Sequence, residues 1–150
     1  MKFWDTSAII PLCLDEPLTT DLKKVLQEDA AIAVWWATPV ECLSAFARLR
    51  REGVLTQTGE DQARNVLACL AEEWTEIEPS REIRHSAARI LLLHPLRAAD
   101  SLQLAAALIW TQGRTAGYHF TCLDQRLREA AHREGFAVLP DIREAKEKPL

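Results

Sequence analysis

Four acidic side chains interrupt apolar or small-residue stretches of the 150-residue chain: Asp5, Glu41, Asp100 and Asp124. Two carboxylates about 4 Å apart repel by roughly 4 kcal/mol at an effective dielectric constant near 20. Three or four of them in one place therefore require a cation or partial protonation. Carboxylate oxygens without His or Cys suit Mg²⁺ or Mn²⁺. An ion held in this way polarises a phosphodiester and activates water, so the acids predict metal-dependent phosphodiester hydrolysis.

Each acid also has a local structural explanation. The stretch Thr38-Pro39-Val40-Glu41 fits a capping box, in which the acid reaches back to the cap residue. Asp124 fits a plain N-cap, and Asp100 gains from the dipole of the helix that it opens. Asp5 fits the start of a turn before the next helix. A shared site is favoured only if the fold brings all four acids together.

Hydroxyl and guanidinium groups close to the acids in sequence are candidates for orienting ligands and binding phosphate. The hydroxyl candidates are Thr6, Ser7 and Thr121. Their alternative role is helix capping. Arg97 and Arg126 are the candidates for contact with RNA phosphates, against the alternative of solvated surface arginines. The four histidines have no partner spacing, so no catalytic histidine is predicted.

Strand-like and helix-like segments alternate along the chain. We expect strands at 2–5, 31–36, 74–79, 118–123 and 136–139. We expect helices at 7–14, 18–29, 38–53, 58–73, 80–94, 98–112 and 124–134. In the third helix Thr38 is the expected N-cap, followed by Pro39, with Gly53 at the end. Most strands are apolar on both faces, which is typical of a parallel sheet covered on both sides, an α/β three-layer sandwich.

The edge at which parallel strands end is where such sheets bind ligands. Asp5 and Asp124 reach this edge at the ends of their strands, and Glu41 follows the second strand by a few residues. Asp100 opens a helix that the pattern alone does not place. Its small neighbours, such as those at 98–99 and 105–107, would let that helix lie close to the sheet.

The composition of the chain limits the classes of protein to which it can belong. The net charge of −4 argues against a nucleic-acid binder that relies on a large positive field, but catalytic acids also lower this total. The cysteines at 13, 42, 69 and 122 lie among apolar neighbours without metal or redox spacing, so buried free thiols are expected. No signal peptide or membrane span is predicted, and the expected location is the cytoplasm.

The segments that carry the four acids resemble the PIN-domain ribonucleases in order and spacing. They are FWDTSAII, TPVECLSAFARL, RAADSLQLAAAL and FTCLDQRLREAA. The resemblance covers residues 1–140 as a PIN-like nuclease domain and leaves 141–150 as a charged C-terminal tail. Within the family, the chain length is similar to that of VapC-type toxins of bacterial toxin–antitoxin pairs.

The resemblance implies a five-stranded parallel sheet of order 3-2-1-4-5 and an Mg²⁺ or Mn²⁺ site on Asp5, Glu41, Asp100 and Asp124. It implies endonucleolytic cleavage of RNA by water, in a type II toxin that forms a homodimer and is inhibited by an antitoxin crossing the acidic pocket. Some members carry a further Asp or Asn shortly after the last acid. Residues 125–127 are Gln, Arg and Leu here, so one metal ion or two stays open.

Three alternative classes fit the residues less well than this assignment. A haloacid-dehalogenase phosphatase needs a second Asp two residues after Asp5, where Ser7 stands. A receiver-type phosphotransfer domain needs an acidic pair and a late lysine, but the only lysines between Phe3 and Lys146 are at 23 and 24. A catalytically silent PIN-like binding module would be favoured by loss of an acid, and none of the four is missing.

Overall fold

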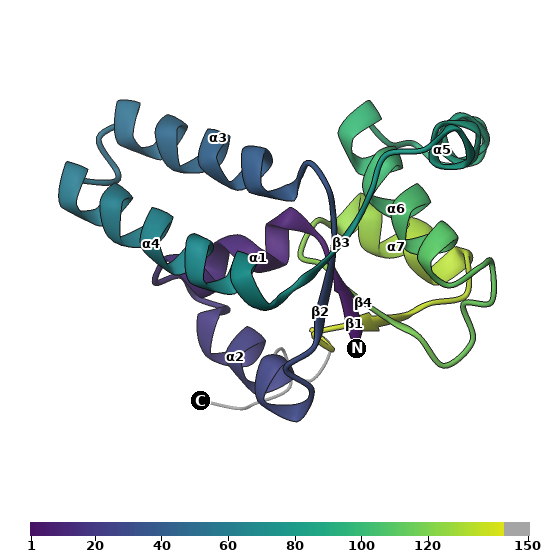
Figure 1. Ribbon diagram of the computed structural model, residues 1–150, viewed down its shortest axis with the longest axis horizontal. Helices are drawn as coiled ribbons and strands as arrows, with labels where there is room; N and C mark the ends of the chain where they lie inside the picture. The colour runs from purple at the N-terminus through teal and green to yellow at the C-terminus, as the bar shows by residue number, and fades with distance from the viewer. Residues whose placement is uncertain (143–150) are drawn as a thin grey trace.

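A five-stranded, all-parallel sheet forms the middle layer of the protein (Figure 1). The computed structural model describes residues 1–142, so most of the predicted tail at 141–150 lies outside the described residues. From one edge to the other, the strands are β3 (Thr75–Ile77), β2 (Ile32–Trp35), β1 (Lys2–Trp4), β4 (His119–Thr121) and β5 (Ala137–Leu139). The predicted order 3-2-1-4-5 is therefore confirmed, with β1 in the centre.

Helices cover both faces of the sheet, as a three-layer α/β sandwich requires (Figure 1). One face carries α1 (Thr6–Cys13), α2 (Thr19–Glu28), α3 (Thr38–Arg51) and α4 (Gln57–Glu73). The other face carries α5 (Arg81–Leu93), α6 (Ala98–Trp110) and α7 (Gln125–Arg133). All seven helices begin and end within a few residues of the predicted bounds.

Successive side chains of each strand enter two separate hydrophobic cores. In β1, Phe3 belongs to the core under α5, α6 and α7, and Trp4 belongs to the core under α1 to α4. Both side chains are fully buried, and Phe3 stacks on Phe120 of β4 with ring centroids 5.3 Å apart. This two-sided burial is the physical reason for the continuous apolar runs in the sequence.

The helix α6 packs on the sheet with a run of three alanines among its buried residues. Residues 105–107 are all alanine and have no exposed surface. They pack in the same core as Phe3 and Ala33 of the two central strands. The prediction that small residues would let this helix approach the sheet is confirmed, and the approach decides where Asp100 lies.

Two local predictions are wrong. The N-cap of α3 is Ala37, which makes no side-chain cap bond; Thr38 is the first residue inside the helix, so no capping box forms with Glu41. Only Cys42 and Cys122 are buried as predicted, because Cys13 is half-buried and Cys69 is exposed on α4; all four thiols are free. Among the described helices, none combines the length and hydropathy needed to cross a membrane.

Candidate acidic site

The four predicted acids all lie at the beginnings of helices. Asp5 and Asp124 are the N-cap residues of α1 and α7; Asp5 directly follows β1, and Asp124 is the third residue after β4. Glu41 and Asp100 lie in the first turns of α3 and α6. Because parallel strands end at one edge of the sheet, three of these helix starts share that edge. The fourth, that of α6, reaches the same group through its close packing on the sheet.

Asp5 is the most buried of the four acids, with 4% of its surface exposed. Its Oδ2 accepts hydrogen bonds from the backbone nitrogen and hydroxyl of Ser7, at 3.0 and 2.6 Å, and from Sγ of Cys122 at 3.7 Å. Burial, with a smaller contribution from the charges of Glu41 and Asp100, raises the pKa of Asp5 to about 6 against the lowering effect of the Ser7 hydrogen bonds. Asp5 is therefore within electrostatic range of two other acids.

Glu41 is held by two neutral donors. Its Oε2 accepts a 2.7 Å hydrogen bond from Oγ1 of Thr6 and a 3.1 Å bond from Nε2 of Gln103. Gln103 was not among the residues predicted from the sequence. The signal for it was an amide side chain three residues after Asp100, in a helix whose other buried residues are alanine, leucine and one serine. A residue at that spacing shares the helix face of Asp100.

Asp100 interacts electrostatically with both the buried Asp5 and the exposed Asp124. Its pKa is raised, first by burial and then by the charge of Asp124, against the lowering effects of the backbone and guanidinium of Arg97. Asp124 is exposed, and its Oδ1 accepts a 2.9 Å hydrogen bond from the backbone nitrogen of Leu127. The N-cap explanation of Asp124 is thus confirmed, and the same residue also lies within electrostatic range of Asp100.

The candidate hydroxyls have different surroundings. Ser7 contacts Asp5 and also accepts a 2.9 Å hydrogen bond from the backbone nitrogen of Leu123, and Thr6 contacts Glu41. Thr121 is fully buried, and its Oγ1 has no hydrogen-bond partner among the described residues. Its contribution to this edge is its backbone oxygen, which accepts from the nitrogen of Asp5 at 2.9 Å.

The candidate arginines also differ. Arg97 is exposed at the N-cap of α6, beside Asp100. Arg126 is exposed on α7 and makes no hydrogen bond or ion pair with the described residues. Arg128 instead donates to three backbone oxygens, those of Cys122, Leu139 and Pro140, at 2.7 to 3.1 Å. Arg128 therefore supports the fold, whereas Arg97 interacts electrostatically with Asp100 and Arg126 is exposed two residues after Asp124 in the chain.

The side chains of the four acids are chemically suited to bind a hard divalent cation. All four supply carboxylate oxygens, and Oδ2 of Asp5 and Oε2 of Glu41 are already fixed by protein donors. Within the described chain, however, no three His, Cys, Asp or Glu side chains come together closely enough to form a finished metal shell. Mutual repulsion between carboxylates opposes such an arrangement unless positive charge offsets it. The acids are thus in electrostatic range of one another but not in a coordination sphere.

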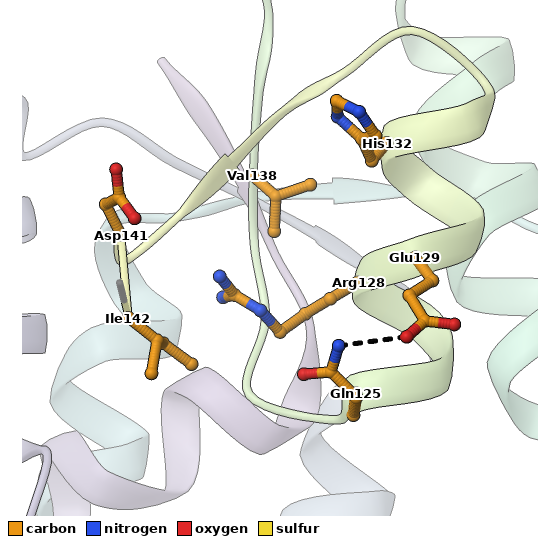
Figure 2. Close-up of a pocket in the computed structure, with 7 residues that line it drawn as sticks. All are labelled: Gln125, Arg128, Glu129, His132, Val138, Asp141 and Ile142. Atoms are coloured by element: carbon orange, nitrogen blue, oxygen red, sulfur yellow. Dashed lines mark hydrogen bonds between the residues drawn. The ribbon is translucent and has the colours of Figure 1, made fainter. Parts of the chain in front are cut away.

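A hollow of about 440 Å³ lies elsewhere, between α7 and the segment after β5 (Figure 2). Arg128, His132 and Val138 line it, and Gln125 at its rim donates to Glu129. None of the four acids lines this hollow. The guanidinium of Arg128 in its wall is occupied by the backbone oxygens described above. The residues that line this hollow are therefore a weaker candidate for a functional site than the acidic edge.

The fold and the acidic edge define the class of the protein: a three-layer α/β protein that gathers carboxylates where its central parallel strands end. The PIN domain family model matches residues 2–132, and the chain belongs to this family. PIN domains are generally nucleases, and PIN nucleases generally use divalent metal ions.

One solved structure with this fold is the crystal structure of FitAcB from Neisseria gonorrhoeae. Its TM-score is 0.63 at 16% sequence identity, and the match covers 93% of this chain and 97% of that chain. At this identity the likeness concerns the fold. No curated protein matches the sequence.

Proposed function

We propose that this protein is a metal-dependent endoribonuclease that hydrolyses phosphodiester bonds in RNA, and that it is the toxin of a type II toxin–antitoxin pair. The observation that carries the proposal is that acids from the starts of four separate helices lie close enough for their charges to interact. Asp5 experiences the charges of Glu41 and Asp100, and Asp100 experiences the charge of Asp124. Membership of the PIN family supports a nuclease, and the resemblance of the four segments to PIN-domain ribonucleases supports RNA as substrate. The chain length, which is similar to that of VapC-type toxins, supports the assignment as a toxin.

The residues that would hold Mg²⁺ or Mn²⁺ are Asp5, Glu41, Asp100 and Asp124. When bound, the ion would polarise the phosphodiester and lower the pKa of its water. Asp5 must lose its proton before it can act as a ligand, which its pKa of about 6 allows at neutral pH. The Thr6 hydroxyl holds one oxygen of Glu41 in place, and the Ser7 hydroxyl holds one oxygen of Asp5.

Binding of RNA to an acidic edge needs nearby positive charge. Arg97 and Arg126 flank Asp100 and Asp124 in sequence and are exposed, so they are the proposed phosphate contacts. The proposed protein partners are an antitoxin, whose C-terminal segment crosses the acidic edge, and a second copy of the chain in a homodimer. The proposed location is the cytoplasm, where RNA and antitoxin would both be available.

Incubation of the purified protein with total RNA and Mn²⁺ or Mg²⁺ tests the nuclease. We expect cleavage that is lost with EDTA and in the Asp5→Asn and Asp100→Asn variants. Asp61→Asn, which changes an exposed acid on α4, is the matched control and should cleave like the wild type. Cleavage that persists in EDTA or in Asp5→Asn would overturn the proposal. Binding of RNA without cleavage would instead identify a silent binding module.

Expression in a bacterial host tests the assignment as a toxin. The wild-type protein should arrest growth, Asp5→Asn should not, and co-expression of the small gene next to it should restore growth. Normal growth with the active nuclease would contradict the toxin assignment and leave the nuclease intact. Light scattering of the purified protein reports whether it forms the proposed homodimer.

A further inference from the structure

Gln103 lies one helical turn after Asp100 in α6 and is 1% exposed. Its Nε2 lies 2.9 Å from Oγ1 of Thr6, 3.1 Å from Oε2 of Glu41 and 3.2 Å from Oγ1 of Thr38. Thr6 belongs to α1, and the other two partners belong to α3. A single buried amide therefore connects three helices that come from both faces of the sheet.

The carbonyl end of this amide is not satisfied. Oε1 of Gln103 is buried and accepts no hydrogen bond from any described residue. An unpaired buried oxygen costs about 1–3 kcal/mol of stability. A methionine at this position would have a similar shape without that cost. A glutamine is therefore favoured here only through the contacts of its NH₂ group, one of which is to a carboxylate.

Those contacts concern one oxygen of Glu41. Oε2 accepts from both Nε2 of Gln103 and Oγ1 of Thr6, and Thr6 in turn accepts from Gln103. Oε1 of Glu41 has no hydrogen-bond partner within the described chain. With one oxygen fixed by two donors, the carboxylate has a defined orientation and keeps its other oxygen for a ligand. Because Asp100 and Gln103 share α6, the amide also fixes Glu41 relative to Asp100.

We propose that Gln103 is a positioning residue that holds the Glu41 carboxylate in register with Asp100 for binding of the divalent ion. This inference rests on the proposed metal-dependent nuclease. Gln103 does not touch the ion or the RNA. It acts through Glu41, together with Thr6, and its loss changes the affinity of the site while the fold is kept.

The test compares the wild type with Gln103→Met, with Gln103→Leu as a second apolar replacement. Ser101→Ala is the matched control, because Ser101 is equally buried in α6 but donates only to the backbone oxygen of Ala98. Mn²⁺ affinity is measured by electron paramagnetic resonance, the melting temperature without metal by calorimetry, and kcat and KM with RNA. Positioning partners of metal ligands typically change affinity or activity by 10- to 100-fold.

We expect both Gln103 variants to bind Mn²⁺ about 10- to 100-fold more weakly and to lose kcat by a similar factor. Loss of the Nε2 hydrogen bonds and loss of the unpaired oxygen act in opposite directions on the melting temperature, so the Mn²⁺ affinity decides the role of Gln103. A purely structural role predicts unchanged Mn²⁺ affinity and kcat at temperatures where the variants are folded, and that result would overturn the inference.

The two proposals fail in different ways. If the wild type binds Mn²⁺ but does not cleave RNA, the nuclease proposal is wrong, while the Mn²⁺ affinities of the variants still decide the role of Gln103. If the wild type binds no Mn²⁺, both proposals are wrong. If Ser101→Ala weakens Mn²⁺ binding as much as Gln103→Met, the effect belongs to α6 as a whole, and the specific role of Gln103 is rejected.

Discussion

The hydroxyl of Ser7 donates a 2.6 Å hydrogen bond to Oδ2 of Asp5. The same hydroxyl accepts from the backbone nitrogen of Leu123 at 2.9 Å. Leu123 directly precedes Asp124, so Ser7 connects the end of β1 to the chain that carries the last acid. One small side chain therefore fixes Asp5 and the approach to α7 at once.

Replacing Ser7 with alanine should shift the pH dependence of RNA cleavage. The Ser7 hydrogen bonds lower the pKa of Asp5, which burial holds at about 6, so losing the hydroxyl raises this pKa further. We expect the acid side of the pH–rate profile to move to higher pH, as measured with Mn²⁺ between about pH 5 and 8. Ser7→Thr keeps the hydroxyl and is the control. Superimposable profiles for Ser7→Ala and the wild type would contradict this prediction.

Replacing Asp5 with asparagine should stabilise the metal-free protein at neutral pH. The pKa of Asp5 is raised from 3.8 to about 6 in the folded state, so its stabilising contribution is full below pH 3.8 and is lost as pH rises through 6. The difference corresponds to about 3 kcal/mol as an upper estimate.

Thermal unfolding of both proteins from about pH 4 to 8 in EDTA measures this difference. We expect the advantage of Asp5→Asn to grow with pH and to level off above about pH 6. Addition of Mn²⁺ should stabilise the wild type more than the variant. A constant difference across the pH range would show that ionisation of Asp5 is not its cause.

Replacing two neighbouring arginines of α7 should have different effects: Arg128 should affect stability, and Arg126 should affect RNA binding. Arg128→Ala removes three hydrogen bonds to the backbone oxygens at the ends of β4 and β5, and should cost at least about 2 kcal/mol of unfolding free energy. Arg126→Ala should leave stability unchanged, weaken binding of RNA to metal-free protein and reduce its salt dependence by about one ion. Urea unfolding and fluorescence anisotropy measure the two effects. Loss of stability in Arg126→Ala would remove it from the proposed RNA contacts.

Glu134 should stabilise the protein at neutral pH through its ion pairs at the C-terminal end of α7. Its pKa is lowered, because contacts with His94 at 3.0 Å and Arg89 at 3.2 Å outweigh the effect of burial. The stabilisation is therefore present above pH 4.5 and is lost as pH falls through the lower pKa of the folded state. Glu134→Gln should lower the melting temperature at pH 7, and the difference should shrink below pH 4.5. RNA cleavage at 25 °C should not change.

Much of the fold was predictable because local sequence determines local structure. Alternation of strand-like and helix-like segments predicted the sandwich, and the two-sided burial of Phe3 and Trp4 shows why both neighbours had to be apolar. The strand order came from the resemblance to PIN domains, since periodicity does not state which strands pair. Thr38 shows where local sequence fails to predict a contact. A threonine before a proline is typical of an N-cap, but the Thr38 hydroxyl accepts a hydrogen bond from Gln103 instead.

The sequence by itself determined which side chains could do chemistry: four carboxylates at helix starts, with hydroxyls and arginines close by in the chain. Only the tertiary structure decided that Asp100 lies within range of Asp5 and Asp124, because that distance depends on how closely α6 packs on the sheet. The role of Gln103 was hidden for the same reason. Hydrogen bonds between residues 62 to 97 positions apart leave no periodic pattern in a sequence, since only packing of whole helices creates them.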